Sequence, residues 1–190
     1  MEGLSNISSE IVKCTLCDLC LKRTAAVPGE GNEKADIVII GEAPGKNEDL
    51  QGRPFIGMSG KFLSKNLESL GIKRESVFIT NAVKCRPPNN RKPKKEELDR
   101  CRPYLIRQLS AIRPRLILAL GTSSASSLGI EFKHLSEIKG KILEITLNDK
   151  KFNCLVTFHP SFPMRFPSAR KAFLDDLSTA FNLYKNLPTR

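Results

Sequence analysis

Five of the six cysteines have spacings that suit a metal centre. Cys14, Cys17 and Cys20 form a C-x2-C-x2-C run near the N-terminus, whereas Cys85 and Cys101 are separated by fifteen residues. Four thiolates are enough to bind zinc or an iron–sulfur cluster. Zinc ribbons usually carry two C-x2-C pairs, so the long second spacing favours a cluster. The alternative is a set of buried thiols without a ligand.

Three polar residues follow the ends of short apolar runs. Glu42 follows Ile37–Ile40, Asn81 follows Val77–Thr80, and His159 follows a run that ends at Phe158. The carboxyl ends of parallel strands meet at one edge of a sheet, where α/β proteins usually bind ligands. Singly, the three residues have ordinary explanations: a solvated acid, a turn former and a structural histidine. Their coincidence predicts a binding site made of a carboxylate, an amide and an imidazole.

Alternating strands and helices must position these groups. The pattern predicts an α/β three-layer sandwich with a central, mainly parallel four-stranded sheet, in a single domain over residues 1–190. A long loop, rich in glycine and proline, connects the first strand to the helix that begins near Ser59, and it is a favourable place for a ligand site. Pro103 predicts a kink or a restart in its helix. The predicted strands are Ile37–Ile40, Val77–Thr80, Leu116–Leu120, Ile142–Leu147 and Phe152–Phe158. The predicted helices are 59–70, 94–112 and 168–184, together with a short helix entered through the glycine turn at 121–124.

The charge of the chain suits a polyanionic partner. Lys and Arg number 31 against 20 Asp and Glu, which gives a net charge of +11. Nucleic acid is the first candidate, and a merely basic surface is the alternative. No apolar run approaches the length of about 20 residues that spans a bilayer, and the N-terminus lacks the pattern of a signal peptide. We therefore expect a cytoplasmic protein that binds no membrane.

Several motifs in this order resemble the family-4 uracil-DNA glycosylases, the iron–sulfur members of that superfamily. The resemblance extends from about Cys14 to Phe181. It implies that the enzyme flips uracil out of DNA and hydrolyses its N-glycosidic bond without nicking the strand, which starts base-excision repair. The motifs are the N-terminal C-x2-C, GEAPG at 41–45, Glu48-Asp49, GRPFIG-x-SG at 52–60, ITNAVKCRPP at 79–88, Cys101 and HPS at 159–161.

The resemblance implies a role for each residue of the uracil pocket. Asn81 would accept a hydrogen bond from uracil N3–H and donate one to O4, a polarity that cytosine lacks. Phe55 would stack on the base, Glu48 would exclude the 5-methyl group of thymine, and His159 would donate, as a neutral imidazole, to O2 as the base leaves. The backbone amides of Glu42 and Ala43 would assist. The full set is Gly41, Glu42, Ala43, Glu48, Phe55, Asn81 and His159.

The residue that orients the attacking water is left open. Other members of the superfamily carry an aspartate at the position of Ala43, and family 4 does not. Glu42 is the first candidate for this catalytic role, and Asn89 is the second.

Residues that would contact DNA lie in glycine–serine turns and in the basic loop after His159. Met164 or Arg165 would enter the space left by the flipped base; a solvated basic loop is the alternative. The expected contacts are Ser59, Gly60, Thr122, Ser123, Ser161, Met164, Arg165 and Arg170.

The resemblance also implies one [4Fe-4S] cluster with an architectural role. Its ligands would be Cys14, Cys17, Cys85 and Cys101, which leaves Cys20 and Cys154 free. The expected partners are uracil-containing DNA, single- or double-stranded, with free uracil as product. A sliding clamp is a further candidate, although neither terminus shows a clear clamp-binding peptide, and we expect a monomer.

Two other functions remain as alternatives. One is a sister glycosylase that acts on another deaminated base, such as hypoxanthine. The other is a non-catalytic, metal-stabilised nucleic-acid-binding module, which fits the charge and the cysteines but leaves Glu42, Asn81 and His159 unexplained.

Overall fold

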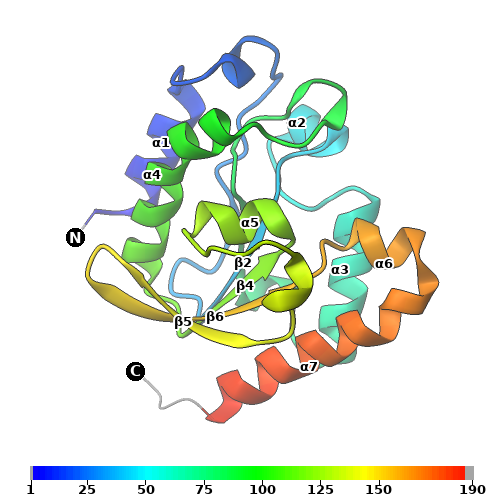
Figure 1. Cartoon of the computed structure of the whole chain (residues 1–190). Helices are drawn as coiled ribbons and strands as arrows, with labels where there is room; N and C mark the ends of the chain where they lie inside the picture. The colour runs from blue at the N-terminus through cyan, green and yellow to red at the C-terminus, as the bar shows by residue number, and fades with distance from the viewer. Residues whose placement is uncertain (1, 187–190) are drawn as a thin grey trace.

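A six-stranded sheet forms the centre of the computed structural model, which describes residues 2–186 (Figure 1). Four parallel strands make up its middle, and an antiparallel strand closes each edge. The predicted, mainly parallel sheet is therefore confirmed, but it has six strands and not four: Ile142–Leu147, predicted as a strand, forms one edge, and the two-residue β1, which was not predicted, forms the other. The order across the sheet is β1 (Glu30–Gly31), β3 (Phe78–Asn81), β2 (Ile37–Gly41), β4 (Leu116–Leu120), β6 (Lys150–Thr157) and β5 (Ile142–Leu147).

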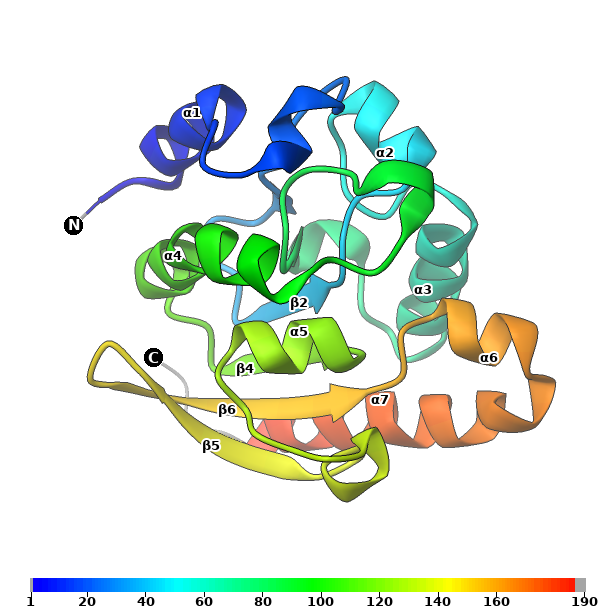
Figure 2. The ribbon, with the colours of Figure 1, turned by 45° about the horizontal axis from the view of Figure 1, so that its top comes forward.

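The central strands are apolar on both faces because helices cover both of them. Residues of β2 alternate between the two cores: Val38 and Ile40 face one side, Ile37 and Ile39 the other. One core includes residues of α1 (Leu4–Lys13), α4 (Lys95–Ile112) and α5 (Thr122–Ser127), and the other includes residues of α3 (Met58–Ser69) and α7 (Arg170–Asn186). Figure 2 shows α4 and α5 on one side of β6 and α7 on the other. The three-layer sandwich is confirmed.

Three helices were not expected from the sequence. The first is α1, whose Leu4, Ile7 and Ile11 lie on one buried face. The other two, α2 (Lys46–Gln51) and α6 (Ser161–Arg165), are short and interrupt segments predicted as loops. Short helices carry weak periodicity, so flanking glycine and proline dominated the prediction.

Helix α4 runs without a break across Pro103, so the predicted restart is wrong. Proline inside a helix costs about 3 kcal/mol. Burial of Leu105, Leu109 and Ile112 on the same helix offsets this cost, because fully burying such a side chain contributes about 1.5–3 kcal/mol.

The parallel strands place their carboxyl ends along one edge of the sheet. Gly41 pairs with Asn81 at the last register position of β2 and β3, and Leu120 pairs with Thr157 at the end of β4 and β6. The segments that follow these strands therefore start side by side. None of the helices within residues 2–186 is long and apolar enough to cross a membrane.

Candidate active site

The strand ends bring the predicted uracil-binding residues together. The Phe55 ring lies 6.0 Å from the His159 ring, measured between centroids. A side chain at Gly41 would collide with both the Asn81 amide oxygen and the Phe55 ring. Glycine is therefore needed at position 41 because the two neighbouring side chains converge on its Cα.

Asn81 presents a hydrogen-bond acceptor that the protein leaves unused. The residue is 1% exposed, and its Oδ1 atom is buried without a partner. Buried polar atoms without partners are rare and cost about 1–3 kcal/mol, so each one needs an explanation. A ligand N–H group at this position would satisfy the atom.

His159 is held in one neutral tautomer by Ser161. The backbone N–H of Ser161 donates to His159 Nδ1 at 3.3 Å, and the Ser161 hydroxyl lies 2.8 Å from the same atom. Because Nδ1 accepts from the backbone, the ring proton belongs on Nε2, where it is available to a ligand. Burial lowers the pKa of His159 below its ordinary value of 6.5, although the carboxylates of Glu42 and Glu48 oppose the shift.

The lowered pKa of His159 gives a pH prediction. Since the folded protein binds this proton more weakly than the unfolded chain, the free energy of unfolding should decrease as pH falls below about 6.5. An NMR titration should place the His159 midpoint below that value. His134, the other histidine of the chain, is exposed and can be replaced by glutamine to leave one imidazole signal. A midpoint at or above pH 6.5 would contradict the lowered pKa of His159.

Glu42 is paired with a residue that was expected to contact phosphate. The Ser123 hydroxyl donates to Glu42 Oε2 at 2.6 Å, and Ser123 is 1% exposed. This hydroxyl is committed to the carboxylate and withdrawn from the surface, so the geometry disfavours a DNA contact by the Ser123 side chain, and the contact itself stays a prediction. The same bond fixes one oxygen of Glu42 and leaves Oε1 for another donor.

Glu48 connects distant parts of the segment between β2 and α3 through hydrogen bonds. Its Oε1 atom accepts from the backbone N–H groups of Ile56 (2.9 Å) and Gly57 (2.7 Å), and its Oε2 atom accepts from that of Gly45 (3.1 Å). The Glu48 side chain thus joins the start of α2 to the segment that follows Phe55. This role is structural, and exclusion of thymine by Glu48 stays a prediction.

Phe55 adopts a conformation that its surroundings enforce. Its φ angle is +50°, in the left-handed region that bulky residues avoid. Arg74 donates to the carbonyls of Pro54 (2.6 Å) and Phe55 (3.1 Å). A side chain at Gly60 would collide with the Phe55 carbonyl, so the first turn of α3 packs directly on this peptide. The ring is largely buried, and stacking on a base stays a prediction.

Asn89, the second candidate for orienting water, lies in an exposed turn. The turn is Pro88–Asn90, in the loop between β3 and α4. That loop passes beside α2 in both ribbon views (Figures 1 and 2). The choice between Glu42 and Asn89 as the residue that orients water stays a prediction.

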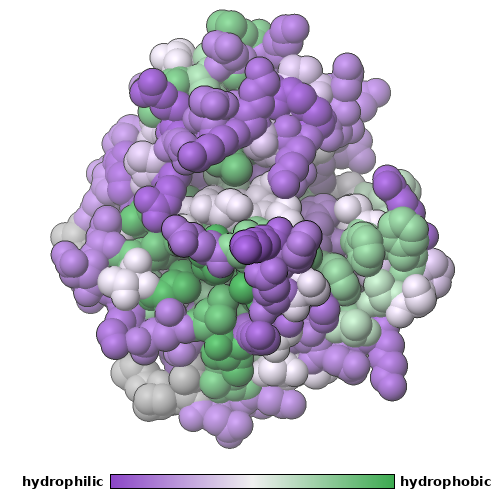
Figure 3. All heavy atoms as spheres, in the orientation of Figure 1, coloured by the Kyte–Doolittle hydropathy of each residue, from purple (hydrophilic) through white to green (hydrophobic). Residues whose placement is uncertain are grey.

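The exposed apolar side chains on α6 and just after it are phenylalanines and not the methionine. Met164 is half-buried and Arg165 is exposed, whereas Phe162 and Phe166 are 42% and 47% exposed. The ring of Phe162 lies 4.6 Å from that of Phe158 and 4.9 Å from that of Phe166, between centroids. Figure 3 shows a hydrophobic area over α6, and a second, larger one below the centre of the same face.

The remaining expected DNA contacts vary in accessibility. Ser59 and Thr122 are partly exposed in the first turns of α3 and α5, where backbone N–H groups favour anions. Gly60 is buried against Phe55, and the Ser161 hydroxyl is bonded to His159. Arg170 is exposed at the start of α7 and donates to the Pro163 carbonyl at 3.2 Å.

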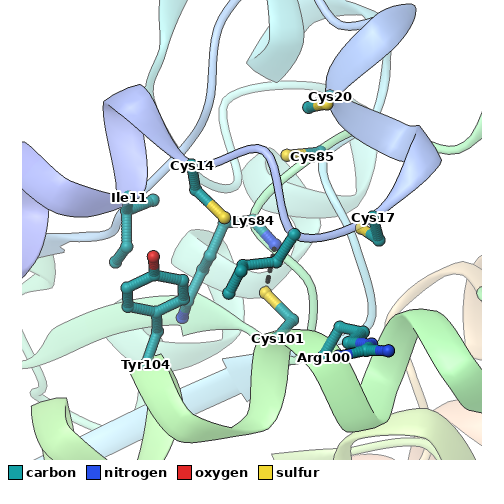
Figure 4. A pocket seen from close by; sticks show the side chains of 10 residues that line it. Ile11, Cys14, Cys17, Cys20, Lys84, Cys85, Arg100, Cys101 and Tyr104 are labelled. Carbon is teal, nitrogen blue, oxygen red and sulfur yellow. Dashed lines mark hydrogen bonds between the residues drawn. The ribbon is translucent and has the colours of Figure 1, made fainter.

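All five clustered cysteines line one pocket (Figure 4). Cys14, Cys17 and Cys20 come from the N-terminal segment, Cys85 follows β3, and Cys101 is on α4. Within residues 2–186, no three side chains of His, Cys, Asp or Glu converge closely enough to hold a single metal ion. Ligands of a four-iron cluster bind separate iron atoms, so they need not converge on one point.

The surroundings of these thiols suit an anionic group. Arg23 donates to Cys85 Sγ at 2.9 Å, the Lys84 backbone N–H donates to Cys101 Sγ at 3.3 Å, and Arg100 also lines the pocket. Burial raises the pKa of Cys85 and raises that of Cys101 to about 12. Such thiols ionise only when a metal displaces their protons, and the donors then stabilise the thiolates. The donor set therefore fits an iron–sulfur cluster.

Sequence reasoning missed three residues that organise the site. Ser123 was read as a phosphate contact, and Arg74 and Lys84 were not singled out. Lys84 carried a usable signal, because it interrupts the apolar run Ala82–Cys85 directly after a buried strand. The partners of Ser123 and Arg74 are 81 and 19 residues away, and no local pattern indicates them.

Comparison with known proteins shows the family to which this chain belongs. Residues 28–180 match the family model described as the Uracil DNA glycosylase superfamily. A type-4 uracil-DNA glycosylase of Archaeoglobus fulgidus is 47% identical over 180 residues, which cover 93% of this chain and 90% of the relative. Proteins of the same description from Saccharolobus solfataricus and Thermotoga maritima are 45% and 43% identical over 93% and 97% of this chain, and over 84% and 96% of their own lengths. The chain belongs to the type-4 uracil-DNA glycosylase family.

Proposed function

We propose that this enzyme removes uracil from DNA by hydrolysing the bond between uracil N1 and the deoxyribose, which leaves an abasic site for base-excision repair. The unpaired, buried Oδ1 atom of Asn81 carries the proposal, because it is an acceptor placed to bind an imide N–H. The Asn81 amide nitrogen would donate to O4. Cytosine presents an acceptor and a donor in the reverse order, so the same amide would reject it.

Each polar group of the site would act in a different step of the reaction. As the glycosidic bond breaks, negative charge develops on uracil O2, and the Nε2–H group of His159 would donate to it. Water then adds to the sugar carbon, and the free oxygen of Glu42 would orient it while Ser123 fixes the other oxygen. Glu48 would limit the space at the uracil 5-position. No step requires a lysine nucleophile, so the strand would remain intact.

A glycosylase assay tests this proposal. Purified protein should release uracil from U·G, U·A and single-stranded substrates, and alkali should then cleave the DNA at the abasic site. A T·G substrate should remain intact. If the uracil-containing DNA survives alkali treatment, the enzyme function fails. Release of hypoxanthine but not uracil would support the sister-glycosylase alternative.

Glu42→Gln should reduce single-turnover cleavage about 10- to 100-fold, because the amide keeps the shape of the side chain but loses its charge. Ser123→Ala should reduce it less, since it frees the carboxylate without removing it. Full activity of Glu42→Gln would show that another group orients the water.

DNA binding would use the strand-end surface and α6. Phe162 or Phe166 would supply the apolar wedge in preference to Met164, because their rings are the exposed ones. Arg165 and Arg170, together with the first turns of α3 and α5, would contact phosphates. We keep a monomer as the working assembly, and gel filtration with light scattering would test it.

Cys14, Cys17, Cys85 and Cys101 would hold one [4Fe-4S] cluster. When bound, the cluster supplies a covalent connection between the N-terminal segment, the loop after β3 and α4. Cys85→Ser should lose most of the bound iron and visible absorbance, and its Tm should fall by more than about 5 °C. Cys20→Ser is the matched control and should retain both. Loss of the cluster in Cys20→Ser would show that the ligand set is different.

A further inference from the structure

Lys84 is a buried lysine at the junction between the uracil pocket and the cysteine pocket. It is 1% exposed, and its Nζ atom donates to Thr80 Oγ1 (2.5 Å), the Asn81 carbonyl (2.8 Å) and Gln108 Oε1 (2.7 Å). All three N–H groups of the ammonium ion are therefore used. Its side chain also lines the pocket of the cysteines, as Figure 4 shows.

The three acceptors of Lys84 are uncharged oxygen atoms. Burying a cation costs several kcal/mol, and a well-packed apolar side chain such as methionine is often as stable at such a position. Lysine at this position therefore contributes no more to stability than an apolar side chain of similar size would. Its use indicates that the hydrogen bonds of the ammonium ion serve a purpose other than stability.

Two of the three hydrogen bonds of the Lys84 ammonium ion are made to the end of β3. Thr80 and Asn81 are the last two residues of this strand, and Lys84 reaches back to both from the turn that follows. Its backbone N–H donates to Cys101 Sγ (3.3 Å), and its carbonyl accepts from Val27 N (2.7 Å). One residue thus joins the end of β3 to α4 and to the N-terminal segment.

Asn81 depends on this support because its side-chain oxygen has no hydrogen-bond partner among residues 2–186. An amide that no hydrogen bond orients takes its position from its own backbone. The backbone carbonyl of Asn81 is held by the ammonium ion of Lys84.

We infer that Lys84 is a positioning residue for base recognition: its ammonium ion fixes the backbone of Asn81 so that the side-chain amide is preset for uracil. The inference rests on the proposed function, since it assigns Asn81 to the uracil edge. Lys84 acts through Asn81 and does not touch the base.

Lys84→Met tests the inference, because methionine fills similar space without donating. Free uracil should inhibit this variant about tenfold more weakly than the parent enzyme, and kcat/KM on a uracil substrate should fall about 10- to 100-fold. Gln108→Met is the matched control: Gln108 belongs to the same buried network through Lys84, Thr80 and the Pro28 carbonyl, but it makes no hydrogen bond to Asn81. Its inhibition constant for uracil should change less than about threefold at a similar Tm.

A double-mutant cycle separates positioning from general destabilisation. In an Asn81→Ala background, Lys84→Met should cause little further loss, because the residue through which it acts is gone. If folded Lys84→Met, with its visible absorbance intact, binds uracil like the parent enzyme, the inference is overturned. Additive losses in the cycle would overturn it as well.

If Lys84→Met does not fold, Thr80→Val tests the inference about Lys84 in its place. Valine matches threonine in shape and removes the acceptor that lies next to Asn81 on β3, whereas Gln108→Met removes the acceptor on α4. Weaker inhibition by uracil in this variant supports the inference, and unchanged inhibition refutes it. The parent enzyme on a uracil-containing oligonucleotide is the reference throughout: if it is inactive, the proposed function fails, whereas an active parent with an unaffected variant rejects only the role of Lys84.

Discussion

Asn81→Asp should reduce single-turnover excision of uracil by more than about 100-fold. The carboxylate keeps an acceptor for N3–H, but it cannot donate to O4 and it repels that oxygen. A site built to hydrogen-bond its ligand discriminates strongly when one partner is wrong, because the buried polar groups are left unpaired. The unpaired Oδ1 atom, in a residue that is 1% exposed, puts this position among the most sensitive in the chain.

The measurement for Asn81→Asp is release of uracil and cytosine from matched oligonucleotides under enzyme excess. Asn182→Asp, the same change at an exposed position on α7, is the control and should behave like the parent enzyme. If Asn81→Asp retains more than about a tenth of the parent rate, Asn81 does not recognise the uracil edge.

His159→Ala should reduce the rate of the chemical step about 10²- to 10³-fold, the usual effect of removing one donor to a developing anion. The tautomer set by Ser161 aims the Nε2–H group into the site, and the lowered pKa keeps the imidazole neutral. Affinity for DNA should change little, since the donor matters mainly as the bond breaks.

Ser161→Ala is the matched variant for His159. It removes the hydroxyl from Nδ1 but leaves the backbone N–H, so the loss should be about tenfold or less. Single-turnover rates together with DNA affinity separate the two effects. A His159→Ala enzyme whose affinity falls while its rate of cleavage is unchanged would place the histidine in binding and not in catalysis.

Much of the fold was predictable because its strands are buried on both faces. Continuous apolar runs such as Leu116–Leu120 coincide with observed strands, and the topology of parallel strands then places Asn81 and His159 at one edge. The meeting of Gly41, Asn81 and Phe55 follows from the same geometry. For this reason the uracil-binding residues could be proposed from sequence patterns and a family resemblance.

The supporting residues could not be predicted, because their partners are distant along the chain. The bond between Ser123 and Glu42 depends on how two strand-end turns face each other, and neither turn signals the other. Arg74 follows α3 in the sequence, and it donates to the carbonyl of Phe55, which precedes that helix. The turn at 88–90 and its place beside α2 were not predicted either, because the loop between β3 and α4 carries no periodic pattern.

The carboxylate of Glu48 has a consequence for the search along DNA. Its three bonds to backbone N–H groups exist in the free protein, so the loop need not fold each time an extruded base arrives. Capture should then be limited by the lifetime of the open base pair and not by closure of the enzyme. We therefore expect excision to be faster at weakly paired uracil, which opens more often, than at stably paired uracil.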